Sequence, residues 1–490
     1  MTRSTIGTLQ SLAHAVLLPG FDGLTAPDWL RRRLDESLGG VCLFARNVAD
    51  LDQLRTLTDD LRSGRPDLVV SIDEEAGDVT RLDAAAGSRF PGNFALGRVD
   101  DVAATEAIAA DVGRLLVRAG VTLNLAPCAD VALDPANPVI GTRSFGRSPD
   151  LVARHTAAFV RGQQSVGVAA CVKHFPGHGD TGTDTHLGLA TLDESWDELE
   201  LTALPPFRAA LDAGVAAVMA GHLLVPAVDA LPATVSHRWL TGILRGDMGF
   251  TGAVVTDALE MAAIAAQYGI VDGAVRALAA GADLLCFGGE DAGEDLVDAV
   301  ATALVEAVRQ GRISDERLYE AASRARALGR PAPDAGDQAA PALADEIADR
   351  ALLVNGPLPA LPGAGGTLVL RCQPQRNIAV GRVPWGPARP EAGLPGPVTE
   401  HLVLPGAALP ATEIAAARSV LLITRDRHRH PFMDETATAL RRLRPDAVLV
   451  EMGTAAPDSA PAIASAGATL ANSRAVVRAL LRVRAGTGTE

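Results

Sequence analysis

One segment of the sequence concentrates side chains that can carry acid–base chemistry. Residues 173–186, KHFPGHGDTGTDTH, hold three histidines and two aspartates among glycines and hydroxyls. Asp184 and His186 are separated by one residue, so in a turn the carboxylate can bond one imidazole nitrogen and leave the other available. Such a pair fixes the tautomer and makes the histidine a competent acid and base near neutral pH. Any one of these residues could simply bond the loop backbone, but the cluster as a whole favours catalysis.

Lys173, which opens this segment, is the only lysine in the chain. The 44 lysine and arginine residues are otherwise all arginine, which implies that arginine is acceptable nearly everywhere else. A compact ammonium fits a closed pocket that a broad, planar guanidinium does not. We therefore expect Lys173 to contact ligand hydroxyls in a confined site, with a residual surface lysine as the alternative.

Other candidate residues are carboxylates and arginines that lie further apart in the sequence. Asp257 ends an apolar run and could be a nucleophile, a base or a metal ligand, or could instead cap a helix starting near Ala258. Asp73 ends another apolar run, Arg81 follows eight residues later, and Arg143 lies in the segment NPVIGTRSFG. Carboxylate and guanidinium groups together form the usual polar grip on sugar hydroxyls and an amide carbonyl. Either arginine could alternatively be a surface residue.

The elements that must position these side chains are apolar runs that alternate with amphipathic segments. The runs lie at 13–20, 41–46, 69–73, 122–127, 170–175, 217–222, 253–258 and 282–288. Each is apolar almost throughout, as expected of parallel strands covered on both faces. Eight such units in about 330 residues predict an α/β chain that begins with a (β/α)8 TIM-type barrel. Polar residues gather at the carboxyl ends of the runs, where the loops of a barrel converge on one concavity.

The length of 490 residues predicts more than one domain. We expect the barrel at 1–328, a linker rich in Ala, Pro, Gly and Asp at 329–345, and a smaller α/β sandwich domain at 346–490. Buried strands are predicted in the sandwich at 367–372, 419–425 and 447–453, whereas the Pro/Gly-rich stretch 373–411 receives no assignment.

Composition indicates a globular protein and excludes several partners. Apolar residues make up 48% and charged residues 21%, and the formal net charge of −15 argues against nucleic acid or an anionic membrane as a partner. The N-terminus lacks the pattern of a signal peptide, and no run is long enough to span a membrane. Five scattered cysteines without a CxxC pair favour reduced thiols in the cytoplasm. We expect no cofactor and no metal, and the oligomeric state stays open.

The motifs resemble those of the family 3 glycoside hydrolases, specifically the β-N-acetylglucosaminidase branch. KHFPGHGDTGTDTH and VVTDALEM carry the resemblance, and IDEEAGDVTRL, NPVIGTRSFG and MAGHLLVPAVD follow the family's order and spacing over about residues 10–330. The resemblance implies that Asp257 is the nucleophile, that His186 is the proton donor and that Asp184 orients His186. It also implies that five residues hold the terminal sugar, namely Asp73, Arg81, Arg143, Lys173 and His174.

The function implied is that of a retaining exo-β-N-acetylglucosaminidase. Such an enzyme hydrolyses terminal β-linked N-acetylglucosamine by double displacement through a covalent glycosyl-enzyme. The resemblance further implies muropeptide or chitooligosaccharide-like substrates and a role in recycling peptidoglycan of the cell wall. The sequence departs from the branch in three places. Glu74-Glu75-Ala76-Gly77, then Asp78, stand where Gln-Glu-Gly-Gly is usual, Ala258 stands where many relatives have Asp, and residues 346–490 are added to a barrel that many members have alone. We expect no catalytic residue beyond 346.

Three other functions are compatible with parts of the pattern. A neutral imidazole does not repel an anionic acceptor, so a β-N-acetylglucosaminide phosphorylase that uses phosphate is one alternative. Lys173, His174, His222 and Asp257 also resemble the metal site of an amidohydrolase barrel, but the first strand lacks the H-x-H pair that such a site needs. A non-catalytic sugar-binding protein would not need Asp257 together with the Asp184–His186 pair.

Overall fold

The computed structural model describes residues 3–289, 293–330, 341–358, 366–374, 377–454 and 462–482. The chain forms two compact units. The barrel unit comprises Met1–Glu75, Thr105–Ile140 and Arg147–Ala339, and the sandwich unit comprises Ala76–Ala104, Gly141–Gly146 and Ala340–Glu490. Two segments from the first third of the chain therefore belong with the C-terminal residues rather than with the barrel.

The barrel unit contains, in its described residues, eight parallel strands that follow one another around the barrel. They are β1 (Leu17–Pro19), β2 (Gly40–Leu43), β3 (Val69–Ile72), β4 (Leu123–Asn124), β5 (Ala169–Phe175), β7 (Ala217–Ala220), β9 (Ala253–Thr256) and β10 (Leu285–Phe287). Six of them, from β2 to β9, form one hydrogen-bonded sheet, and β1 pairs with β10. A bridge between Val255 and Leu284 joins β9 to β10. The prediction of a (β/α)8 barrel is confirmed.

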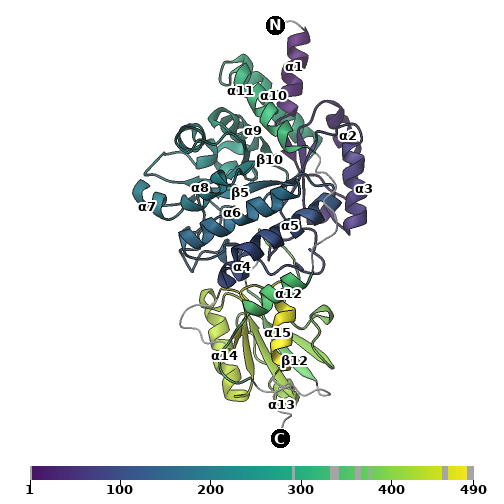
Figure 1. Ribbon diagram of the computed structural model, residues 1–490, viewed down its shortest axis with the longest axis vertical. Coiled ribbons are helices and arrows are strands. Elements are labelled where there is room, and N and C mark those ends of the chain that lie inside the picture. Colours follow the sequence, from purple (N-terminus) through teal and green to yellow (C-terminus); the bar gives the residue numbers. More distant parts are fainter. Residues whose placement is uncertain are drawn as a thin grey trace. The chain divides into compact units, whose positions relative to one another are not determined.

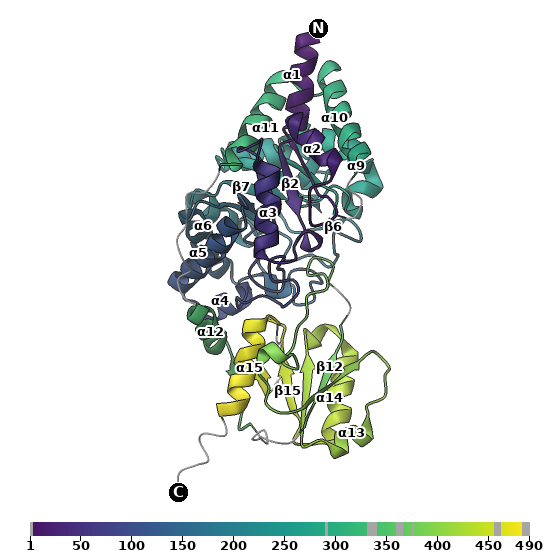
Figure 2. The ribbon, with the colours of Figure 1, turned by 90° about the vertical axis from the view of Figure 1, so that its right-hand side faces the viewer.

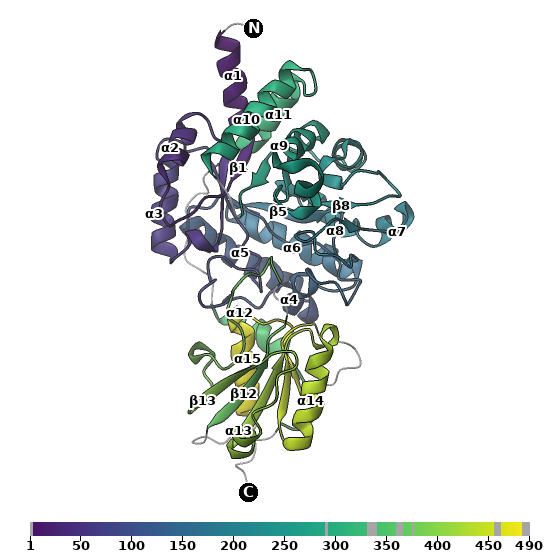
Figure 3. The same cartoon turned by 180° about the vertical axis from the view of Figure 1, so that it is seen from behind.

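Helices cover the outside of this barrel, and most of them join one strand to the next (Figures 1 and 3). They are α1 (Arg3–His14), α2 (Asp28–Asp35), α3 (Leu51–Arg62), α5 (Val102–Arg118), α6 (Pro149–Ser165), α7 (Trp196–Leu201), α8 (Pro205–Asp212), η4 (Arg238–Asp247), α9 (Ala262–Ala280), α10 (Glu294–Arg309) and α11 (Asp315–Leu328). Four of these helices begin with a capping side chain, since Asp50, Ser148, Ser195 and Ser314 each accept a hydrogen bond from a first-turn amide. Short segments add η1 (Ala45–Asn47), η3 (Ala233–Val235) and the two-stranded sheet of β6 (Ala190–Thr191) and β8 (Leu223–Leu224).

The strands are apolar on both faces because the barrel is filled as well as covered. Its interior is packed by small and branched side chains, among them Cys42, Val69, Leu123, Cys171, Met219, Val255 and Cys286. The opposite side of each strand contacts the surrounding helices. Close approach of the first two strands requires a glycine, because a Cβ atom on Gly40 would lie 2.7 Å from the side chain of Leu18.

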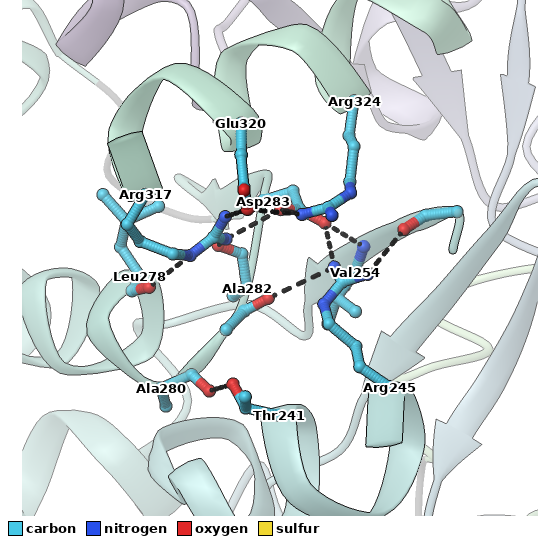
Figure 4. Close-up of polar contacts among 12 residues, drawn as sticks. Thr241, Arg245, Val254, Leu278, Ala280, Ala282, Asp283, Arg317, Glu320 and Arg324 are labelled. Carbon is cyan, nitrogen blue, oxygen red and sulfur yellow. Dashed lines mark hydrogen bonds and ion pairs between the residues drawn. The ribbon is translucent and has the colours of Figure 1, made fainter. Parts of the chain in front are cut away.

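A buried charge cluster stabilises the amino-terminal end of this strand array (Figure 4). Asp283, which precedes β10, is fully buried. Its carboxylate accepts hydrogen bonds from Arg245 at 2.5 Å, Arg317 at 2.7 Å and the backbone N–H of Val254 at 2.8 Å, and Arg324 lies 3.4 Å away. In a (β/α)8 barrel the amino-terminal end of the strands usually contributes to stability, and the carboxyl-terminal end carries the catalytic residues.

The sandwich unit is built on a six-stranded sheet with the order β11-β16-β15-β14-β12-β13 among the described residues. The strands are β11 (Leu353–Val354), β12 (Thr367–Cys372), β13 (Val398–Val403), β14 (Ser419–Thr424), β15 (Val448–Glu451) and β16 (Ile463–Ala464), of which only β11 is antiparallel to its neighbour. The remaining elements of this unit are α4 (Asn93–Val99), η2 (Gly141–Arg143), α12 (Pro341–Arg350), η5 (Pro390–Ala392), α13 (Ala411–Ala416), η6 (Arg427–Arg429), α14 (Pro431–Leu443) and α15 (Leu470–Arg482).

Helices pack on both faces of this sheet, which makes the unit a three-layer α/β sandwich (Figures 2 and 3). Leu368 and Leu370 of β12 point into the core shared with α13 and α14, whereas Val369 points into the core shared with α15. The period of two along a strand places alternate side chains in the two cores. The predicted smaller α/β sandwich is therefore confirmed.

The domain boundaries expected from the sequence stay a prediction. Most of the expected linker, 329–345, falls on residues 331–340, which lie outside the described residues, and α12 already begins at Pro341. Within the part of the chain that is described, no helix has both the length and the apolar character needed to cross a bilayer.

Candidate active site

Lys173 lies near the carboxyl end of β5 between two carboxylates. Its Nζ atom is 2.6 Å from Oδ1 of Asp73 and 2.8 Å from Oε1 of Glu75, and its side chain is 2% exposed. Asp73 comes directly after β3, so the ends of two strands meet at this ion pair. A single ammonium satisfies both carboxylates in a buried space where a guanidinium would be too broad. This geometry accounts for the one lysine of the chain.

His174, the next residue, is oriented by a buried aspartate. Nδ1 of His174 lies 2.7 Å from Oδ2 of Asp130, and the backbone N–H of His178 donates to Oδ1 of Asp130 at 2.6 Å. Burial opposes the charged form of Asp130, but the charge of His174 and its hydrogen bond outweigh burial and lower the pKa of Asp130 well below its usual range. Because Asp130 is ionised, the hydrogen of His174 is placed on Nδ1.

The loop that follows β5 carries the Asp184–His186 pair. Nδ1 of His186 lies 2.7 Å from Oδ1 of Asp184, and the backbone N–H of His186 donates to the same oxygen at 3.0 Å. Burial disfavours the charged carboxylate, but these two hydrogen bonds lower the pKa of Asp184. Asp184 is buried, whereas the imidazole of His186 is 28% exposed. The spacing of one residue therefore gives the contact that the sequence predicted.

The base of this loop is anchored to the preceding strand–loop segment. Asn137 donates from Nδ2 to the carbonyl oxygens of His178, at 2.8 Å, and Thr181, at 3.0 Å. His178 is buried and lies within 3.2 Å of the hydroxyls of Thr181 and Thr185 on its two ring nitrogens. His178 is thus part of the loop's internal structure, and His186 is the histidine left nearer the solvent.

Asp257 lies at the carboxyl end of β9, and its surroundings keep it ionised. Its backbone N–H donates to Ala220 of β7 at 3.0 Å, and its Oδ1 accepts the N–H of Ala258 at 2.8 Å. Burial opposes ionisation, but the charges of His174, His222 and His186 lower the pKa of Asp257. An ionised carboxylate at this place can attack an electrophilic carbon.

The alternative role of Asp257 as a helix cap is not what the structure shows. Helix α9 begins at Ala262, five residues beyond Asp257, and its capping position is Met261. The Asp257 carboxylate bonds only the adjacent amide in the contacts described above. The segment between β9 and α9 is a loop, which leaves the carboxylate partly exposed at the end of the strand.

His222 fixes the backbone next to Asp257. It is fully buried, and burial lowers its pKa although the negative charge of Asp257 acts in the opposite direction. The ring donates from Nε2 to the carbonyl oxygen of Ala258 at 2.9 Å, and its Nδ1 lies 2.8 Å from the hydroxyl of Thr234, which donates to the carbonyl oxygen of Gly221. His222 therefore holds the loop that carries the candidate nucleophile.

Arg81 and Arg143 are described with the sandwich unit. Arg81 donates from Nη2 to the carbonyl oxygen of Ala379 at 3.0 Å. Arg143 is buried at the end of η2, and its carbonyl oxygen accepts from Nδ2 of Asn93 in α4 at 2.7 Å. The Arg81 side chain and the Arg143 backbone are thus each fixed by a hydrogen bond within the sandwich unit, and Arg143 is not a surface residue.

The structure brings six of the predicted residues together in the barrel unit. These are Asp73, Lys173, His174, Asp184, His186 and Asp257. Sequence reasoning missed Glu75, which shares Lys173 with Asp73, and Asp130, which orients His174. Asp130 follows the fourth apolar run, and neighbouring parallel strands end side by side. Its position beside the fifth run was the signal that could have identified it.

One group of side chains has the atoms of a metal site. Cys128, Asp130 and His174 place one ligand atom each within 4.8 Å of one another. The same atoms bond each other, because Sγ of Cys128 donates to Oδ2 of Asp130 at 3.1 Å and Nδ1 of His174 contacts that oxygen.

The contacts of Lys173 bear on the amidohydrolase alternative. Lys173 forms ion pairs, as an ammonium, with Asp73 and Glu75, which does not fit the bridging lysine of an amidohydrolase.

Comparison with known proteins identifies the family of the chain. Residues 25–328 match the model of the glycosyl hydrolase family 3 N-terminal domain. The chain belongs to glycosyl hydrolase family 3. A β-hexosaminidase of Neisseria gonorrhoeae is 40% identical over 264 residues, which cover 52% of this chain and 72% of that protein. The family resemblance seen in the sequence motifs is confirmed, and the protein is a glycoside hydrolase that acts on carbohydrate.

Similar solved structures differ in how much of this chain they cover. A family 3 β-N-acetylglucosaminidase from Paenibacillus matches 97% of this chain and 97% of its own, with a TM-score of 0.85 and 33% identity. A β-N-acetylhexosaminidase from Beutenbergia cavernae matches only 66% of this chain with 98% of its own, with a TM-score of 0.60 and 29% identity. The first is thus similar to both units, whereas nearly the whole of the second corresponds to two thirds of this chain.

Proposed function

We propose that this family 3 enzyme is a retaining exo-β-N-acetylglucosaminidase. The observation that carries the proposal is the Asp184–His186 pair, joined at 2.7 Å in the loop after β5, together with the Asp257 carboxylate at the carboxyl end of β9 in the same barrel unit. A nucleophilic carboxylate and a separate proton donor are the two groups that retaining hydrolysis requires. The β-hexosaminidase and β-N-acetylglucosaminidase names of the similar proteins support N-acetylglucosamine as the sugar.

The reaction proceeds as a double displacement. Asp257 attacks C1 of the sugar while His186 gives its proton to the glycosidic oxygen, so the bond from C1 to the leaving group breaks as the bond to the carboxylate forms. Water then attacks C1, His186 takes a proton from that water, and the Asp257 carboxylate is released. The lowered pKa of Asp184 keeps this residue ionised, so that it stabilises the imidazolium in both steps.

Substrate-binding roles are proposed for the five residues that match the family pattern, namely Asp73, Lys173 and His174, and Arg81 and Arg143. The buried pair of Asp73 and Lys173 offers an acceptor and a donor for sugar hydroxyls. The bond to Asp130 fixes which nitrogen of His174 carries hydrogen, which favours one orientation of a bound hydroxyl.

We place the enzyme in the recycling of cell-wall fragments in the cytoplasm, with muropeptides or chitooligosaccharide-like molecules as substrates. The five cysteines are all free and buried, as expected of a protein in a reducing compartment. Uptake of radiolabelled muropeptide fragments in a deletion strain, with accumulation of uncleaved fragments, would support this role. Unchanged fragment levels would contradict it.

Covalent trapping tests the central assignment. A 5-fluoro glycoside of N-acetylglucosamine, or a 2-fluoro glycoside in which fluorine replaces the acetamido group, should accumulate as a glycosyl-enzyme, because the electronegative fluorine slows the second displacement. Mass spectrometry of the digested protein should find the label on the peptide that contains Asp257. A label on another peptide would remove Asp257 as the nucleophile, and Asp257→Ala should abolish both labelling and turnover of an aryl N-acetylglucosaminide.

The acceptor is tested separately with phosphate. If water is the acceptor, the wild-type protein releases free N-acetylglucosamine at the same rate with and without phosphate. Release of the sugar 1-phosphate, rising with phosphate concentration, would instead identify a phosphorylase, while the nucleophile and proton donor would keep the same roles.

A further inference from the structure

Asp78 connects three separate segments of the sandwich unit. Its Oδ2 accepts from the hydroxyl of Thr142 at 2.5 Å and from Nη2 of Arg425 at 2.8 Å, and its Oδ1 accepts from the backbone N–H of Ala468 at 3.1 Å. The side chain of Asp78 is 3% exposed and that of Arg425 is 12% exposed. Arg425 directly follows β14, and Ala468 lies between β16 and α15. The carboxylate therefore joins the Thr142 segment to the carboxyl ends of two parallel strands.

The segment that contains Thr142 also carries Arg143, and it is fixed on its other side by α4. Asn93 donates to the carbonyl oxygen of Arg143 at 2.7 Å. Phe145 is buried against α4 so closely that a Cβ atom on Gly97 would lie 1.7 Å from the Phe145 carbonyl oxygen. With Asp78 on one side and α4 on the other, the backbone at Arg143 has a single defined position.

Arg425 is itself held in place by an aromatic ring. Its guanidinium carbon lies 5.8 Å from the ring centroid of Trp385, and that of Arg371 lies 4.9 Å from the same centroid. Arg371 makes its ion pair with Glu400 at 2.7 Å, whereas Arg425 makes its ion pair with Asp78. The two arginines thus share a ring but differ in whether they contact the Asp78 cluster.

We infer that Asp78 is a positioning residue for Arg143. Asp78 bonds Thr142 on one side and residues of the 340–490 segment on the other, and it thereby fixes Arg143 for substrate binding. The inference rests on the proposed function, in which Arg143 binds the sugar. Arg425 and Ala468 complete the shell of Asp78, so residues beyond 340 support the segment that carries Arg143. A buried carboxylate that accepts three hydrogen bonds is rigid, and rigid support is what a binding side chain requires.

Thr142 offers the mildest test, because valine has nearly the shape of threonine but no hydroxyl. Thr142→Val should raise KM for an aryl N-acetylglucosaminide about tenfold with kcat nearly unchanged, since the lost interaction acts on binding of ground state and transition state alike. Thr142→Ser, which keeps the hydroxyl, should restore KM to within about twofold of wild type. Arg425→Gln should act like Thr142→Val, with a rise in KM of about tenfold or more.

Arg371→Gln is the matched control, because it removes an arginine from the same ring without touching Asp78. It should leave KM unchanged even if it lowers the melting temperature. A wild-type KM in both Thr142→Val and Arg425→Gln, or an equal KM rise in Arg371→Gln, would overturn the role of Asp78 while leaving the proposed function intact. Failure of the proposed function is read from the wild-type protein, which would then not turn over the glycoside at all, and the role of Asp78 would fall with it.

Discussion

His186 and Asp184 are joined twice through one oxygen, since Oδ1 of Asp184 lies 2.7 Å from Nδ1 and 3.0 Å from the backbone nitrogen of His186. A ring bound in this way has one orientation and one tautomer. The backbone contact also ties the orientation of the ring to the conformation of the loop. The pair therefore works as one unit, and its two members should respond differently to substitution.

Asp184→Asn should lower kcat for an N-acetylglucosaminide with a poor leaving group by about 100-fold or more, because the amide stabilises neither the tautomer nor the imidazolium. Steady-state kinetics measure this change. The loss should be much smaller for a dinitrophenyl glycoside, whose leaving group needs little protonation. Equal losses for both substrates would contradict proton donation by His186.

Lys173→Arg should lower kcat/KM by about 100-fold, although the charge is kept, because a guanidinium does not fit between Asp73 and Glu75 in the geometry of the ammonium. Arg55→Lys is the control, since Arg55 is half exposed and pairs with Asp59 on the surface of α3. The control should keep the wild-type kcat/KM. A fully active Lys173→Arg protein would show that the ammonium is not required.

Asp283→Asn should destabilise the barrel unit by about 3–5 kcal/mol, because it removes the fully buried charge that Arg245 and Arg317, themselves partly buried, are paired with. Glu320 contacts the same cluster through Arg324 but is 56% exposed (Figure 4). Glu320→Gln should therefore change the free energy of unfolding by less than about 1 kcal/mol. Urea denaturation measures both variants, and similar losses in the two would show that burial of Asp283 is not what makes its ion pairs matter.

Glu451 gives the sandwich unit a pH dependence. Burial, assisted by the charge of Asp426, raises the pKa of Glu451 to about 7. The folded state then binds a proton that the unfolded state releases above its ordinary pKa of 4.5, so stability should fall as pH rises from about 4.5 to about 7 and level off above that. Thermal unfolding followed from pH 4.5 to 8 measures this fall.

Glu451→Gln mimics the protonated side chain, since its Nε2 can donate to the hydroxyl of Thr424, which lies 2.7 Å from Oε2 of Glu451. The variant should match the wild type near pH 5 and exceed it in melting temperature at pH 8. A wild-type protein that is more stable than the variant at pH 8 would show that the ionised form is the stabilised one.

The barrel was predictable because its signal is local. All eight runs became strands, since a strand covered on both faces must be apolar along its whole length. The central strands of the sandwich, β12, β14 and β15, followed for the same reason. Strand β13 lies within the stretch for which no strand was predicted. It is at the edge of the sheet, where most of its residues are exposed or only partly buried. Its sequence, VTEHLV, therefore mixes polar and apolar residues and lacks the continuous apolar run of a covered strand.

The site was predictable where its contacts are local or match a motif. The Asp184–His186 contact spans two residues and follows from spacing. The contact of His174 with Asp130 spans 44 residues, and that of Asp78 with Arg425 spans 347. Such pairs depend on how distant segments pack, and the period of apolar residues does not report them.

The bond between Asp78 and Arg425 sets an order of events during synthesis. A ribosome adds roughly 5–20 residues per second, so the 347 residues between the two partners take roughly 20–70 s to appear. Until then Asp78 and the Arg143 segment are without the strands that enclose them. The segment around Thr142 and Arg143 thus gains its full support only after Arg425 and Ala468 have been synthesised, and a nascent chain released before then is left without that support.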